Sequence, residues 1–77
     1  MKTKMKTIVV SDQVLRIVDD ATYEGENLAT NIDFVISVEG EHYIVDIFNI
    51  SVEDNDKAQI DSFQARTLEE AVSYVFD

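Results

Sequence analysis

The residues that could do chemistry are few, and a single histidine is the first of them. His42 follows the Glu39-Gly40 turn of a predicted β-hairpin. Nucleophilic catalysis requires an activated Ser, Thr or Cys beside its base, and a third group that orients the base. The hairpin offers His42 only Ser37 as a cross-strand neighbour, on an exposed and flat site. We therefore expect a solvated histidine and no enzyme activity.

Two sets of carboxylates have spacings that resemble known sites. Asp33 and Asp46 are expected near each other across the hairpin, as an acid–base pair would be, but like charges in that position destabilise a sheet. Register offset or solvent exposure is the better interpretation. The acidic segment containing Glu53, Asp54 and Asp56 lacks the glycine and the terminal glutamate of an EF-hand loop. Beyond weak, non-specific binding of divalent cations, we expect no metal site and no cofactor.

The composition is strongly acidic. The 77 residues include 16 Asp and Glu against 6 Lys and Arg, for a net charge of −10. Lys2, Lys4 and Lys6 account for three of the six bases, so the chain from Thr7 onward is more acidic still. Such a charge repels nucleic acid and anionic membranes and attracts basic protein surfaces. The alternative is that the acidity only keeps a small protein soluble.

The length and the first residues limit what else the chain can be. A chain of 77 residues makes one small domain, residues 1–77, in which residues 1–6 are expected to be a flexible basic tail, with an edge strand over Lys4–Val10 as the alternative. The apolar run from Ile8 to Val10 is too short for a signal peptide or a membrane span. With no cysteine and two glycines, neither a disulfide framework nor a phosphate-cradling loop is expected. The cytoplasm is the expected compartment.

Residues 31–50 give the clearest structural pattern and predict a β-hairpin. Apolar residues alternate on both sides of the turn, at Ile32, Phe34, Ile36, Val38, Tyr43, Val45 and Ile47. A two-residue Glu39-Gly40 loop places Ile36 opposite Tyr43 and Phe34 opposite Val45. A four-residue loop changes these partners but not the faces, because the side-chain period is two. One face of the hairpin is therefore expected to be apolar.

Two helices and a third strand complete the predicted fold. Ser11 and Asp12 are typical of a helix start, and the apolar spacing that follows predicts a helix over residues 12–22, with a strand over Val14–Val18 as the alternative. Residues 57–65 predict a strand in which a bulge intervenes or both faces carry apolar groups. Thr67 and Glu70 have capping-box spacing and begin a C-terminal helix. The fold class is α+β, in the order α-β-β-β-α, with a three-stranded antiparallel meander packed against the helices.

This predicted topology would gather acidic residues at one rim of the sheet. In a meander, the connection into the first strand and the connection between the second and third strands lie at the same end. The rim would contain Glu24, Glu26, Glu53, Asp54 and Asp56, with Asp19 and Asp20 nearby at the end of the first helix. Carboxylates at a helix C-terminus oppose the macrodipole, which favours a binding role, unless the helix ends later or solvent screens the charges.

The second face of the hairpin is also apolar. Val35, Ile44, Phe48 and Ile50 lie opposite the expected core, and exposed apolar patches usually mark an interface. Three interpretations remain open for this face. It forms a homodimer, it docks a partner, or the first helix or the N-terminal tail covers it.

Three families resemble parts of this pattern. The order α-β-β-β-α resembles the double-stranded RNA-binding domain, but residues 67–70, TLEE, present two acids where that family has phosphate-binding lysines. Residues 62–76, SFQARTLEEAVSYVF, resemble the strand-to-helix passage of HicB-type antitoxins. In length, acidity and element order the chain is similar to small phage-encoded anti-CRISPR and related DNA-mimic inhibitors. That resemblance implies a protein that occupies the basic channel of a defence nuclease, with carboxylates in place of phosphates.

These observations predict a non-catalytic inhibitor or regulator that binds a basic surface of a nucleic-acid-handling protein, such as a nuclease. It would contact neither nucleic acid nor a membrane directly. The alternative is an antitoxin-like or homo-oligomerising module that works through the apolar sheet face.

Overall fold

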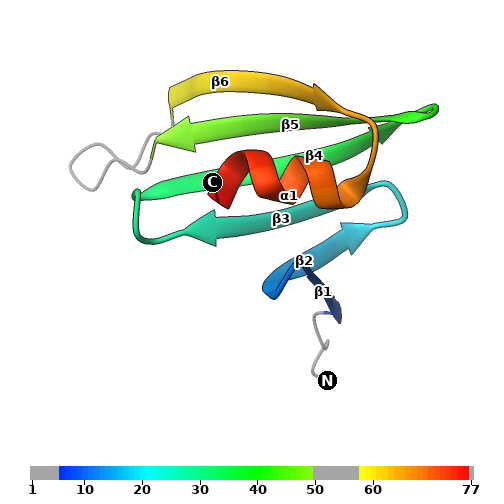
Figure 1. Ribbon diagram of the computed structural model, residues 1–77, viewed down its shortest axis with the longest axis horizontal. Helices are drawn as coiled ribbons and strands as arrows, with labels where there is room; N and C mark the ends of the chain where they lie inside the picture. The colour runs from blue at the N-terminus through cyan, green and yellow to red at the C-terminus, as the bar shows by residue number, and fades with distance from the viewer. Residues whose placement is uncertain (1–5, 50–57, 77) are drawn as a thin grey trace.

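The computed structural model describes residues 6–49 and 58–76, which form a six-stranded antiparallel sheet and one helix (Figure 1). The elements are β1 (Lys6–Val10), β2 (Gln13–Asp19), β3 (Thr22–Asn27), β4 (Ile32–Glu39), β5 (His42–Asn49), β6 (Ala58–Ala65) and α1 (Leu68–Phe76). The strands pair in chain order. The predicted α-β-β-β-α order with a three-stranded meander is therefore wrong, because the sheet has six strands and the described residues contain a single helix.

The predicted helix over residues 12–22 is wrong, and its alternative, a strand over Val14–Val18, lies within β2. Ser11 and Asp12 do not begin a helix. They have φ angles of 51° and 69° and form the turn between the paired residues Val10 and Gln13. Two positive φ angles are what a type I′ hairpin turn requires, so the local backbone directs the chain into a second strand.

Strand β3 occupies residues that the sequence pattern places in a connection. Its sequence, TYEGEN, shows no apolar alternation because Gly25 takes a core-facing position. A Cβ atom at Gly25 would lie 2.7 Å from Cζ of Phe34, its cross-strand partner. The ring of Phe34 therefore supplies the apolar group that the β3 sequence lacks.

The hairpin prediction is confirmed for the faces, and of the two loops left open the Glu39-Gly40 loop is wrong. Phe34, Ile36, Val45 and Ile47 are all buried. Ile36 lies opposite Val45 and Phe34 opposite Ile47, so the two-residue turn is Gly40-Glu41 and not Glu39-Gly40. Gly40 has a φ of 62°, which suits the first turn position of a type II′ hairpin.

Strand β6 contains the bulge that was one of the two expectations for its sequence. Ile47 pairs with Asp61 and Phe48 with Gln59, which leaves Ile60 without a partner in the ladder. The extra residue shifts the alternation, so Phe63 lies opposite Val45 on the core side of the sheet.

The C-terminal helix is confirmed, and Thr67 caps its start as predicted, although Glu70 bonds the residue before the cap rather than the cap itself. The backbone N–H of Glu70 donates to Oγ1 of Thr67 at 3.0 Å, and Oε1 of Glu70 accepts the N–H of Arg66 at 2.9 Å. Ala71, Val72 and Val75 are buried. Within residues 6–49 and 58–76, no helix is long and apolar enough to cross a membrane.

The core lies between α1 and one face of a curved sheet. The helix contacts β5 and β6 at one edge and β1 at the other, and crosses in front of the sheet in Figure 1. The buried apolar residues come from every strand except β3, and from the helix: Val10, Leu15, Phe34, Ile36, Val45, Ile47, Ala65, Ala71, Val72 and Val75. The end of β3 is joined to the helix by buried Asn27, whose Nδ2 donates to the carbonyl of Val75 at 3.1 Å.

A tyrosine–aspartate contact also joins the helix to β6 and makes this junction sensitive to pH. Tyr74 donates a hydrogen bond to Asp61 and stacks on Phe63 with ring centroids 4.0 Å apart. The hydrogen bond raises the pKa of Tyr74, and together with the N–H of Ser62 it lowers the pKa of Asp61. The junction is therefore expected to weaken as the pH falls below the ordinary Asp pKa of 3.8 through the folded pKa of Asp61, and as the pH rises through the raised pKa of Tyr74.

Replacing Asp61 with asparagine is expected to lower the pKa of Tyr74 toward its ordinary value of 10.0, because the charged acceptor is lost. The ultraviolet absorbance of tyrosinate measures this pKa during an alkaline titration. Tyr74→Phe identifies which of the three tyrosines is responding, and Asp46→Asn, on the other sheet face, is the matched control. An unchanged titration curve in Asp61→Asn would show that the contact does not persist in solution.

Candidate functional site

The face of the sheet opposite α1 brings charged and apolar side chains together, and we call it the open face. Its members alternate along the strands with buried core residues, because successive strand side chains point to opposite faces. The open face consists of Arg16 on β2, Glu24 and Glu26 on β3, Asp33 and Val35 on β4, and Ile44, Asp46 and Phe48 on β5. All eight side chains are partly buried.

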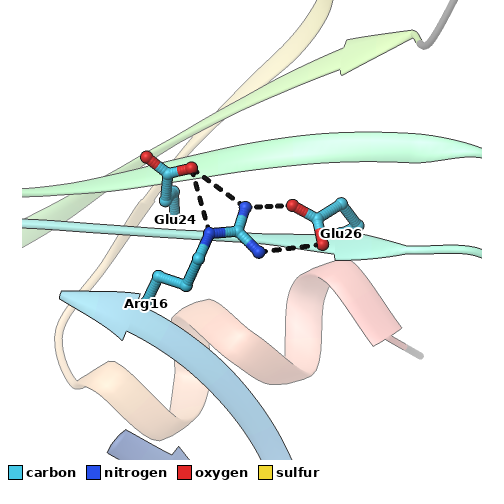
Figure 2. Close-up of polar contacts among 3 residues, drawn as sticks. All are labelled: Arg16, Glu24 and Glu26. Carbon is cyan, nitrogen blue, oxygen red and sulfur yellow. Dashed lines mark hydrogen bonds and ion pairs between the residues drawn. The ribbon is translucent and has the colours of Figure 1, made fainter. Parts of the chain in front are cut away.

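Arg16 binds two glutamates at once (Figure 2). Its Nε and Nη2 donate to Oε1 of Glu24 at 3.2 and 2.9 Å, and its Nη1 donates to Oε1 of Glu26 at 3.0 Å. Nη2 also contacts Oε2 of Glu26. These hydrogen bonds, those to Glu26 first, raise the pKa of Arg16 above its ordinary range. One guanidinium thus serves two carboxylates, and the group of three keeps a net negative charge.

The sheet register sets acidic and apolar side chains side by side. Val35 lies between Glu24 on β3 and Asp46 on β5, while Asp33 lies between Glu26 and Phe48. Asp33 and Asp46 are therefore not opposite each other, and no like-charged pair crosses the hairpin at these positions.

Two residues considered for catalysis have ordinary surroundings. Asp46 accepts hydrogen bonds from Nε2 of Gln59 at 3.0 Å and from Oγ of Ser62 at 3.3 Å. His42 is exposed and lies opposite Glu39, not Ser37. In residues 6–49 and 58–76, no group of three or more His, Asp or Glu residues could hold a metal ion.

A pocket opens on the open face next to Arg16. Its volume is about 250 Å³, and its lining consists of Arg16, Glu24, Gly25, Glu26, Asp33, Phe34, Val35 and Phe48. Sites for drug-sized ligands occupy about 300–1,000 Å³, and a water in the liquid takes about 30 Å³. The pocket is therefore suited to one side chain rather than to a cofactor.

The structure separates the residues that the sequence placed at one acidic rim. Glu24 and Glu26 lie within β3, while Asp19 and Asp20 lie at the β2–β3 turn, where Oδ1 of Asp19 accepts the N–H of Ala21 at 2.9 Å. Asp19 therefore stabilises a turn and does not oppose a helix dipole. Ile50, Glu53, Asp54 and Asp56 fall outside the described residues.

Instead, the structure places two of the predicted acids with three of the predicted apolar residues. Glu24 and Glu26 share the open face with Val35, Ile44 and Phe48. Sequence reasoning missed Arg16. If residues 13–19 are treated as a strand, the alternation of Arg16 with Leu15 and Ile17 places Arg16 on the face opposite the core. Comparison with protein-family models, curated proteins and solved structures finds no match to this chain.

Proposed function

We propose that the protein is a non-catalytic inhibitor or regulator whose open face docks on a basic surface of a nucleic-acid-handling protein, such as a nuclease. The observation that carries this proposal is the mixed character of the open face, where apolar Val35 and Phe48 lie directly beside Glu24, Asp33 and Asp46. Buried apolar contacts surrounded by polar groups are the usual anatomy of a protein interface.

The charge of the chain favours a basic partner. A net charge of −10 accelerates association with a positive surface and opposes contact with nucleic acid itself. A basic surface on a nuclease normally contacts phosphates, and the carboxylates of the open face would take their place there. This is how the anti-CRISPR and DNA-mimic inhibitors that the chain resembles are expected to work, and it would place the protein in the cytoplasm.

Self-association through the open face is the alternative. It is favoured by Val9 and Val14, a cross-strand pair of apolar side chains that extends this sheet face and is 65% and 61% exposed. A two-fold homodimer would, however, bring the same acidic patch of both copies together. Such a contact should strengthen with salt, whereas docking on a basic partner should weaken. Sedimentation or light scattering at low and high salt separates the two.

Reversing two charges on the open face is expected to weaken partner binding strongly. In Asp33→Lys/Asp46→Lys, we expect an affinity loss of at least tenfold, because the attraction to a basic surface becomes repulsion. The assay captures the partner from a bacterial lysate with tagged protein, elutes it with salt, identifies it by mass spectrometry and then measures binding to the purified partner.

The matched control is Asp20→Lys/Glu41→Lys, which changes the net charge equally at two exposed turn residues away from the open face. Equal losses in the two double variants would show that only net charge matters. Undiminished binding in Asp33→Lys/Asp46→Lys, with a normal circular dichroism spectrum, would reject the open face as the binding surface.

A further inference from the structure

The pocket beside Arg16 has the charge, shape and size to hold one cationic side chain. We propose that it receives an arginine side chain from the basic partner surface. This inference rests on the proposed function and specifies the group that the open face recognises.

The charge of the pocket favours a cation. Glu24, Glu26 and Asp33 line it, and Arg16 is the only strand lysine or arginine on the open face in the part of the chain that the structure describes. Glu26 and Asp33 are direct cross-strand partners, an arrangement that is unfavourable for like charges unless cations lie close by. The described lining contains three carboxylates and one guanidinium, a set of charges that attracts a cation.

The walls of the pocket favour arginine over lysine. Phe48 lies opposite Asp33, and Val35 is also part of the lining. A guanidinium group is planar, sheds water more readily than an ammonium group, stacks on an aromatic ring and binds carboxylates with two parallel hydrogen bonds. The volume of about 250 Å³ accommodates such a side chain with its methylene groups against Val35.

Arg16 itself shows that carboxylates of this pocket can arrange around a guanidinium. Its three terminal nitrogens lie between the carboxylates of Glu24 and Glu26, with Nη2 shared by both (Figure 2). Both glutamates keep about a third of their side-chain surface exposed, 38% for Glu24 and 35% for Glu26. A partner arginine entering from solvent would therefore meet Asp33, Phe48 and the outer edge of Glu26.

The test compares two fluorescein-labelled peptides of equal length and charge, (Gly-Arg)₆ and (Gly-Lys)₆, by fluorescence anisotropy at low salt. We expect the arginine peptide to bind wild-type protein about tenfold more tightly than the lysine peptide. Asp33→Asn should reduce this preference to below about threefold. Asp46→Asn, which removes the same charge from the open face outside the pocket lining, should weaken both peptides equally and keep the preference. Phe48→Leu should also reduce the preference, because the aromatic wall is lost.

Each result has a distinct meaning. Equal binding of the two peptides to wild type would overturn the arginine pocket and leave docking on a basic surface intact. The same conclusion would follow if Asp33→Asn kept the arginine preference, as Asp46→Asn is expected to do. Salt-independent binding, or no binding of either peptide at low salt, would count against both proposals. An amide ¹H–¹⁵N spectrum of each variant verifies that it is folded and locates the shifts caused by the arginine peptide, which we expect at Phe48 and Arg16.

Discussion

Phe34→Ala is expected to destabilise the protein by about 3–5 kcal/mol, the usual cost of removing a buried aromatic ring. Phe34 is 1% exposed, and its ring meets that of Phe76 edge-on with centroids 5.7 Å apart. A domain of this size has a total stability of about 4–12 kcal/mol. The loss is therefore a large fraction of the total stability, and a urea titration followed by circular dichroism measures it.

The matched control is Phe48→Ala, which removes the same side chain from the open face. Phe48 is only partly buried and is not part of the core cluster, so its loss should cost no more than about 1 kcal/mol. We expect the opposite order for binding, because Phe48 lies on the open face whereas Phe34 is buried in the core. Equal loss of stability in the two variants would mean that the open face is covered in the native protein.

The sequence predicted the elements whose signals are local. Alternation along β4 and β5 is visible because both strands place apolar residues toward α1 at every second position, and the Thr67–Glu70 capping box marks the start of α1. The sequence left the register open, because Gly40 suits either place in a two-residue turn and only the φ angle decides between them.

The sequence pattern did not predict β2 and β3 as strands, because their own residues do not show a clear strand alternation. The apolar residues of β2 satisfy a helical period as well as a strand, and the positive φ angles at Ser11 and Asp12 that decide the question are not typical of serine. Strand β3 contributes a glycine to the core because Phe34 fills the space from β4. The first error follows from an unrecognised turn, and the second from tertiary packing that overrides local preference.

The candidate site was missed for the same reason. The sequence suggested two separate surfaces, an acidic rim and an apolar face. They become one surface only when β2 and β3 are strands, since this places Arg16, Glu24 and Glu26 in register with Val35 and Asp33. The error at β3 thus moved Glu24 and Glu26 from a sheet face to a loop, and the error at β2 concealed Arg16.

Gly25→Ala is the second large effect that we expect, with a loss of about 1–3 kcal/mol from overpacking. The new Cβ would lie 2.7 Å from Cζ and 3.2 Å from Cε1 of Phe34, and 3.4 Å from Cδ2 of Leu15. Alanine is favoured over glycine in a strand by up to about 1 kcal/mol, so the sign depends on whether the ring can move. The contact of Phe34 with Phe76 and its burial restrict that movement.

A double-mutant cycle with Phe34→Leu decides whether the ring causes the loss. Leucine has no atom at the position of Cζ, so Gly25→Ala should cost at least about 1 kcal/mol less in the Phe34→Leu background than in wild type. Gly40→Ala is the control, because no atom lies within 4 Å of its Cβ position and its cost comes from a φ of +62° alone. That cost should be the same in both backgrounds. If the stability losses of Gly25→Ala and Phe34→Leu are additive, β3 tolerates a side chain at position 25. The absence of a Cβ atom at Gly25 is then not required for the position of the Phe34 ring.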